Sequence, residues 1–184
     1  MRSRIALSGC GGSGKSTLAK ALADRLNYPR IDEGVREWMR DNGVTHLREM
    51  TPADTLKMQD EMLQKKRAHE CALPYFVADR STADNLAYAL RWCARDVSEM
   101  AINQYKILCQ NHAEHNYDLI LFLPWGRIPL VDDGVRSANH AYQYEISCLI
   151  RGILDDWGMP VCTVEATSLN DRVDEAIRAI GAAQ

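Results

Sequence analysis

A glycine-rich segment between an apolar run and an amphipathic run constrains the fold of this chain more than any other feature. Residues 9–16 read G-C-G-G-S-G-K-S and fit the pattern G-x-x-x-x-G-K-[ST]. The apolar residues 4–8 before this segment predict a strand, and leucines recur after it on one face of a predicted helix at residues 15–26. A strand, a glycine loop and a helix in this order are the context that the motif requires. The sequence therefore predicts a P-loop, a backbone cradle for phosphate groups.

Each part of this loop has an expected role. The glycines let backbone N–H groups converge on phosphate oxygens, and the amino terminus of the helix adds a positive partial charge. Lys15 is expected to reach the β- and γ-phosphates, and the Ser16 hydroxyl to ligate Mg²⁺. We therefore expect ATP and Mg²⁺ as cofactors. The predicted nucleotide-binding residues are Gly9, Cys10, Gly11, Gly12, Ser13, Gly14, Lys15, Ser16 and Thr17.

The rest of the chain alternates predicted strands and helices. This alternation favours one α/β domain over residues 1–184, a three-layer αβα P-loop NTPase whose parallel sheet binds ligands at the carboxyl ends of its strands. Residues 124–138 carry prolines, glycines and two arginines without periodicity and predict a loop or lid. Further strands are expected at 28–31, 75–78, 119–123 and 161–164, and helices at 34–42, 51–70, 82–93, 98–112 (opened by a capping-box-like Asp96-x-x-Glu99), around 146–157 and around 173–180.

Acidic residues follow two of these predicted strands. Asp32 and Glu33 follow the second strand, where either carboxylate could accept the proton of an attacking hydroxyl, or the two could simply cap the next helix. Asp79 closes the third strand, where it could hold Mg²⁺ directly or through water, cap the helix that begins near Thr82, or do both. We expect Ser16 and Asp79 to be the metal ligands.

Four arginines could supply positive charge to the phosphates or the substrate. Arg80 could contact phosphate or substrate, and Arg36 either faces the acceptor pocket or forms a surface ion pair. Arg127 and Arg136 in the predicted lid could close over the triphosphate and neutralise the charge that develops during transfer. The predicted catalytic residues are Lys15, Asp32, Glu33, Asp79, Arg127 and Arg136, and the predicted substrate-binding residues are Asp32, Arg36 and Arg80.

Missing motifs and bulk properties narrow the class of P-loop protein. The sequence lacks the Asn-Lys-x-Asp motif with which GTPases read their base, and 184 residues leave little room for the coupling modules of a motor ATPase. A phosphotransferase remains. The net charge of -3 provides no overall basic field for nucleic acid. The sequence contains no run of about 18 apolar residues that would predict a membrane span. The expected location is the cytoplasm, or the host cytoplasm if a phage encodes the chain.

With the P-loop, residues 33–37 (EGVRE), 79–81 (DRS) and 133–136 (DGVR), the chain resembles the AAA_28-type group of small P-loop kinases over nearly its whole length. That group includes the ribosylnicotinamide kinase domain of NadR proteins and phage kinases that phosphorylate 5-hydroxymethyluracil in DNA. The chain is more distantly similar to deoxynucleoside kinases, in which an acid after the second strand is the base and a Glu-Arg-Ser motif ends the third. The resemblance implies a five-stranded sheet in the order 2-3-1-4-5 and leaves Asp32 and Glu33 open as the base.

Three functional hypotheses follow. The first is an ATP-dependent kinase that transfers the γ-phosphoryl group to a hydroxyl of a nucleoside or nucleoside-like small molecule. The second is a phage-type kinase acting on 5-hydroxymethyluracil in DNA, which would need a basic groove. The third is a nucleotide-dependent switch or regulatory ATPase, against which the acids at two strand ends argue. The sequence leaves the oligomeric state open. Candidates for the basic groove, unless they form a solvated helix face, are Lys65, Lys66, Arg67, Arg91 and Arg95.

Overall fold

One parallel sheet organises the chain in a computed structural model that describes residues 3–129 and 139–183. Its strand order is β2-β3-β1-β4-β5, which confirms the expected 2-3-1-4-5 topology. The second strand is shorter than predicted, because only two of its residues pair with β3. The strands are β1 (Arg4–Ser8), β2 (Arg30–Ile31), β3 (Phe76–Asp79), β4 (Leu119–Phe122) and β5 (Val161–Thr163).

Every predicted helix is present, with shifted ends. The structure adds a short 3-10 helix, η1 (Leu47–Glu49), that the sequence did not predict. The expected capping box at Asp96 is wrong, because α5 begins at Glu99 and Ser98 caps it by accepting from the Ala101 N–H. The helices are α1 (Lys15–Leu26), α2 (Val35–Asp41), α3 (Pro52–Cys71), α4 (Thr82–Trp92), α5 (Glu99–Asn116), α6 (His140–Asp156) and α7 (Leu169–Ala182).

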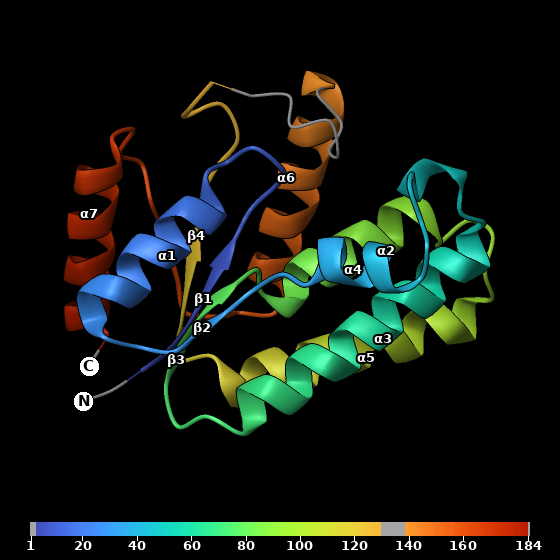
Figure 1. Cartoon of the computed structure of the whole chain (residues 1–184), viewed down its shortest axis with the longest axis horizontal. Coiled ribbons are helices and arrows are strands. Elements are labelled where there is room, and N and C mark those ends of the chain that lie inside the picture. Colours follow the sequence, from blue (N-terminus) through green and yellow to red (C-terminus); the bar gives the residue numbers. More distant parts are fainter. Residues whose placement is uncertain (1–2, 130–138, 184) are drawn as a thin grey trace.

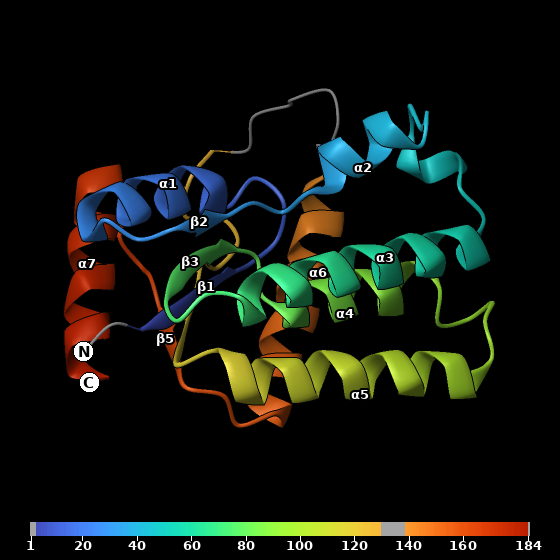
Figure 2. The same ribbon diagram turned by 60° about the horizontal axis from the view of Figure 1, so that its bottom comes forward.

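Helices cover both faces of the sheet, as the alternating pattern predicted. Figures 1 and 2 show α1 and α7 together on one side of the strands and α3, α4 and α5 extending from the other. Successive strand residues point to opposite layers, so Ile5 and Leu7 pack with α1 and α7, whereas Ala6 packs in the layer of α3 to α6. Two apolar layers therefore hold the sheet, one on each face.

The register of the sheet brings the predicted chemistry to one edge. Leu7 of β1 pairs with Asp79 of β3, so the start of the P-loop and the segment after β3 leave the sheet side by side. Ser8 of β1 lies opposite Phe122 of β4, which places the chain after β4 at the same edge. Residues 130–138 of the predicted lid, with Arg136, lie outside the described residues.

Within residues 3–129 and 139–183, no helix combines the length and the apolar character that a bilayer crossing needs.

Candidate active site

The P-loop runs from the end of β1 to the first turn of α1 and requires glycine at both ends. Gly9 has a φ of 149°, and a Cβ there would lie 2.5 Å from the carbonyl oxygen of Leu123. Gly14, the N-cap of α1, has a φ of 84° and provides no side-chain cap. The first N–H groups of α1 are therefore left for a ligand, which is the arrangement that favours an anion.

Lys15 is buried against the loop that it follows. Its ammonium donates hydrogen bonds to the Cys10 carbonyl oxygen at 2.6 Å and to Ser13 Oγ at 3.3 Å. Burial, and then the positive charge of Arg80, lowers the pKa of Lys15 to about 8. Lys15 thus holds a charge that its surroundings oppose, which an incoming phosphate would stabilise.

Asp84 is a buried carboxylate of this site that sequence reasoning missed. It lies in the first turn of α4 and is fully buried. Its oxygens accept hydrogen bonds from the Ser8 hydroxyl, from the Gly9 N–H at 3.1 Å and from the Ser81 N–H at 3.2 Å. Asp84 therefore ties the first residues of the P-loop to the start of α4. The Ser81-x-x-Asp84 spacing of a capping box was the available signal.

Asp79 and Ser16 are the two predicted metal ligands, and the structure shows the surroundings of each. Asp79 does not cap α4, because Ser81 and Asp84 form the capping box there. The Oδ1 atom of Asp79 is buried and has no hydrogen-bond partner among the described residues. Ser16 is exposed in the first turn of α1. One carboxylate, one hydroxyl and phosphate oxygens suit Mg²⁺, which keeps several waters. In the described part of the chain, no three His, Cys, Asp or Glu side chains form a metal site.

Arg80 and Glu33 form an ion pair between the ends of β3 and β2. Arg80 Nε lies 2.6 Å from Glu33 Oε1, and Arg80 Nη1 lies 3.5 Å from Asp84. The guanidinium also lies over the Tyr88 ring, 4.8 Å from its centroid. Burial opposes the charge of Arg80, but Glu33, Tyr88 and Asp84 together raise the pKa of Arg80 well above its ordinary value. The φ of Arg80 is 81°, a conformation that is uncommon outside glycine and costs about 1–3 kcal/mol.

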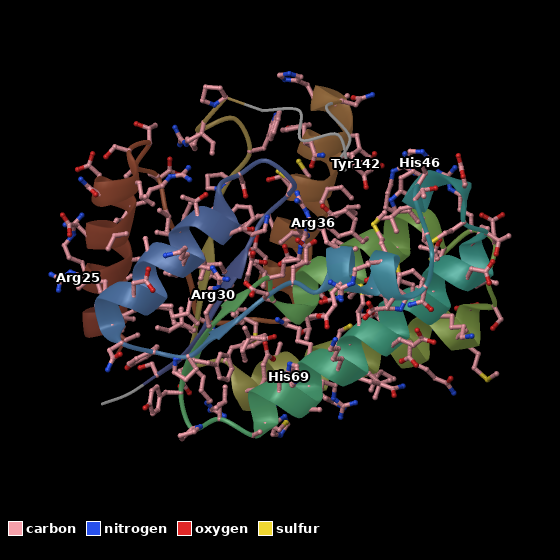
Figure 3. All side chains as sticks on the ribbon, viewed as in Figure 1. Arg25, Arg30, Arg36, His46, His69 and Tyr142 are labelled. Atoms are coloured by element: carbon pink, nitrogen blue, oxygen red, sulfur yellow. The ribbon has the colours of Figure 1, made fainter. Side chains whose placement is uncertain are left out.

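A pocket of about 680 Å³ opens next to this ion pair. Glu33 and Arg80 line it, and so does Gln143, whose amide lies against the P-loop where a Cβ on Gly11 would come within 3.0 Å of it. Figure 3 labels Tyr142, which lines the pocket from α6, and Arg36 on α2. Other lining side chains come from α2, η1, α3 and α4, among them Val35, Leu47, Met58, Gln59, Asn85 and Tyr88.

Two buried amides, Gln59 and Asn85, form a neutral polar pair on the wall of this pocket, which apolar, aromatic and charged side chains also line. Asn85 Nδ2 donates to Gln59 Oε1 at 3.3 Å, and the Tyr105 hydroxyl donates to the backbone oxygen of Gln59 at 3.1 Å. Gln59 belongs to α3 and Asn85 to α4, so the pair joins two walls of the pocket. A ligand with a flat ring and polar edges matches this lining.

The structure separates the two acids that the sequence left as alternatives. Asp32 is exposed and pairs with Arg30 at 2.9 Å. It lines a second hollow of about 530 Å³ with Glu37 and Trp38, and it does not line the pocket beside the P-loop. Glu33 alone of the two reaches that pocket. Both acids line the second hollow, but Glu33 also borders the pocket beside the P-loop.

Arg36 and Arg127 are not among the residues that line this pocket. Arg36 is exposed on α2. Arg127 forms an ion pair with Glu165 in the loop after β5, and both side chains are about half exposed. The Arg127–Glu165 pair links the start of the predicted lid to that loop.

The side chains considered for a basic groove are mostly paired with acids. Lys65 pairs with Glu37 at 3.0 Å, Lys66 with Glu70 at 2.8 Å and Arg91 with Glu145 at 2.8 Å. The two lysines line the second hollow, whereas Arg91 and Arg95 line the pocket beside the P-loop. These residues therefore do not share one groove.

Sequence comparisons agree with the motifs. The model of the AAA_28 family, described as an AAA domain, matches residues 4–172 of the chain. A cytidylate kinase of Haloarcula marismortui is 36% identical over 103 residues, which are 53% of this chain and 49% of that protein. The chain thus spans about half the length of this curated relative.

Solved structures show the same fold. A NadR protein in complex with NAD and AMP-PNP superposes with a TM-score of 0.73 at 20% identity, over 98% of this chain and 49% of the NadR chain. A deoxyadenosine kinase from M. mycoides with bound dATP gives 0.68 at 18% identity, over 98% and 100% of the two chains. A thymidylate kinase from Ehrlichia chaffeensis superposes with a TM-score of 0.66 at 16% identity, over 97% of this chain and 98% of the thymidylate kinase chain. The fold is therefore that of P-loop kinases.

Proposed function

The chain belongs to the AAA_28 family, as its motifs predicted, and on this premise we propose that it is an ATP-dependent kinase that phosphorylates an alcohol group of a nucleoside-like small molecule. One observation carries this proposal. The ion pair of Glu33 and Arg80 lines a pocket that also touches the P-loop through Gln143, so an acid and the phosphate-binding loop border the same cavity.

On the donor side, the P-loop would bind the triphosphate of ATP. Its backbone N–H groups and the amino terminus of α1 favour the phosphates, and Lys15 would turn from the Cys10 carbonyl oxygen to a phosphate oxygen. The Ser16 hydroxyl and the Asp79 carboxylate would hold Mg²⁺. Mg²⁺, when bound, neutralises charge on the phosphate oxygens. Arg127 and Arg136 would neutralise charge from the lid, as predicted, and Arg127 would have to leave its ion pair with Glu165 to do so.

On the acceptor side, Glu33 would accept the proton of the attacking hydroxyl. The acceptor oxygen forms a bond to the γ-phosphorus, while the bond from that phosphorus to the bridging oxygen of ADP breaks. Arg80 holds the Glu33 carboxylate at 2.6 Å and so fixes its orientation for this proton transfer. Asp32 has no comparable place, because it pairs with Arg30 outside the pocket.

The charge balance at Arg80 favours an alcohol over a phosphate as the acceptor. At the Glu33 end of the pocket a phosphate would meet a guanidinium whose charge is already offset, because Arg80 lies beside the carboxylates of Glu33 and Asp84. Arg95 also lines the pocket and forms no ion pair among the described residues, so the nucleoside monophosphates of the panel test whether it binds an acceptor phosphate. The size of the pocket and its amide pair, Gln59 and Asn85, suit a nucleoside-like molecule. A pocket of this kind also argues against a switch, which needs no acceptor.

The paired basic residues favour a small molecule over DNA. Three of the five cations that a DNA groove would use are offset by carboxylates, and they do not line one surface. DNA with 5-hydroxymethyluracil remains the alternative acceptor to be tested.

The test is transfer of labelled γ-phosphate from Mg²⁺·ATP to a panel of acceptors. The panel holds nucleosides, ribosylnicotinamide, nucleoside monophosphates, and DNA with or without 5-hydroxymethyluracil, and Lys15→Ala is the blank. We expect label on a nucleoside or on ribosylnicotinamide. Label confined to monophosphates would overturn the alcohol assignment, and label confined to modified DNA would overturn the small-molecule assignment. Hydrolysis without any labelled acceptor would favour the switch.

A further inference from the structure

Arg172 of α7 reaches the P-loop, although α7 contributes no residue to the lining of the pocket beside the P-loop. Its side chain is 3% exposed, although it follows a surface loop. Its Nη1 atom donates to the Ser13 carbonyl oxygen at 2.9 Å, and its Nε atom donates to the Ala166 carbonyl oxygen at 2.8 Å. One guanidinium therefore joins the loop after β5 to the P-loop. Figure 1 shows the two helices involved, α1 and α7, side by side.

Glycine at position 14 leaves the space that this guanidinium fills. A Cβ on Gly14 would lie 2.6 Å from Arg172 Nη1 and 2.9 Å from Cδ1 of Ile128. The glycine of the motif thus has two reasons to be there, its φ of 84° and the close approach of Arg172. The contact is built into the loop and is not a chance surface interaction.

The other end of the contact is also fixed. Glu175, one turn after Arg172 on α7, accepts hydrogen bonds from the N–H groups of Glu165 and Ala166, the latter at 2.9 Å. Arg172 then binds the Ala166 carbonyl oxygen. Backbone N–H groups and a carbonyl oxygen of the loop after β5 therefore both bond to side chains of α7. These bonds fix the position of the Arg172 side chain.

The bond to Ser13 affects the direction of the P-loop backbone. A P-loop binds phosphate with N–H groups, so its carbonyl oxygens must point elsewhere and find other donors. Arg172 supplies a charged donor to one of them. Removal of the side chain would take away this bond together with the bond to the Ala166 carbonyl oxygen.

We propose that Arg172 is a positioning residue for the phosphates of ATP, acting through the Ser13 carbonyl oxygen to hold the P-loop in its phosphate-binding conformation. This inference rests on the proposed function in one respect, that the P-loop binds ATP. It adds a residue outside the P-loop motif and on the last helix of the chain to the donor site.

The test measures binding of AMP-PNP and of inorganic tripolyphosphate, each with Mg²⁺, by isothermal titration calorimetry at a temperature where every variant is folded. Arg172→Met should weaken both ligands by the same factor, about tenfold or more, the usual size of a lost charged hydrogen bond. Arg172→Lys should recover part of the loss, because an ammonium can still donate to Ser13. The matched control is Arg178→Met, an exposed arginine on the same helix, which should bind as the wild type does.

The outcomes separate the inference from the proposed function. If the wild type binds both ligands and Arg172→Met binds them equally well, the inference fails while the donor site stands. A loss confined to AMP-PNP would mean that Arg172 acts on the base or sugar, and would overturn the role through Ser13. A lower melting temperature with unchanged affinity would show a merely structural residue. Wild-type protein that binds neither ligand would overturn both ideas.

Discussion

Arg80 Nε and Glu33 Oε1 lie 2.6 Å apart, although 46 residues separate them along the chain and they follow different strands. An acid placed to accept a proton from a substrate must be held in one orientation, and the arginine provides that restraint. Substitution of Glu33 therefore tests whether this acid is the base.

Glu33→Gln should lower kcat by about a hundredfold or more, because the amide keeps the shape of the side chain but cannot accept the proton. Asp32→Asn is the matched control and should leave kcat within about twofold, since Asp32 pairs with Arg30 outside the pocket. Steady-state kinetics with the acceptor that the panel identifies would measure both. Equal losses in the two variants would remove the assignment of Glu33.

Asp79→Asn should raise the Mg²⁺ concentration needed for half-maximal activity by about 10–100-fold, as loss of a carboxylate near a bound metal commonly does. A Mg²⁺ titration at saturating ATP would measure the change. Asp118→Asn serves as the control, because Asp118 precedes β4 at the opposite edge of the sheet and pairs with Arg4. An unchanged Mg²⁺ requirement in Asp79→Asn would show that Asp79 is not a ligand of Mg²⁺.

Nucleotide binding should take up a proton in mildly alkaline solution. The pKa of Lys15 is about 8 in the free protein, and a bound triphosphate favours the charged form and raises this pKa. Uptake should therefore approach one proton per AMP-PNP near about pH 9 and be close to zero near about pH 6.5, where Lys15 is already charged. Calorimetry in buffers of different ionisation enthalpy counts the protons. Lys15→Arg, which stays charged throughout, should show no alkaline uptake, and equal uptake in this variant would exclude Lys15 as the source.

Asp84→Asn should destabilise the fold by about 3 kcal/mol, because an amide presents N–H groups where the buried carboxylate accepts several hydrogen bonds. Asp54 occupies the same position in the first turn of α3, but it is exposed and bonds the Thr51 cap. Asp54→Asn should therefore cost less than about 1 kcal/mol. Urea denaturation compares the two, and similar losses would mean that Asp84 matters only as a helix cap.

The order of the elements could be predicted because each one has a local signal. Neighbouring residues are enough to recognise the apolar run before Gly9 and the glycine motif itself. They were also enough to predict that Asp79 lies at the end of a strand. The family resemblance supplied the strand order, which local patterns do not contain. These expectations were confirmed in the sheet and in the helices.

The missed residues act through contacts between distant parts of the chain. Asp84 reaches Gly9 because β1 and β3 pair in one register, and Arg172 reaches Ser13 across 159 positions. The choice between Asp32 and Glu33 depends on which way the chain turns after β2, which adjacent acids do not reveal. Pattern analysis detects the residue types of a site better than it detects which of them meet.

The wall of the pocket beside the P-loop that α2 contributes to is packed less tightly against the molecule than the other walls. None of the residues of α2 is buried, whereas α3, α4 and α6 each contribute buried side chains to the molecule. Local unfolding of such a segment exposes little apolar surface and therefore costs little free energy. Amide hydrogens of α2 should accordingly exchange with solvent long before those of the sheet, and we expect the acceptor to enter and leave by local opening of α2 while the sheet stays folded.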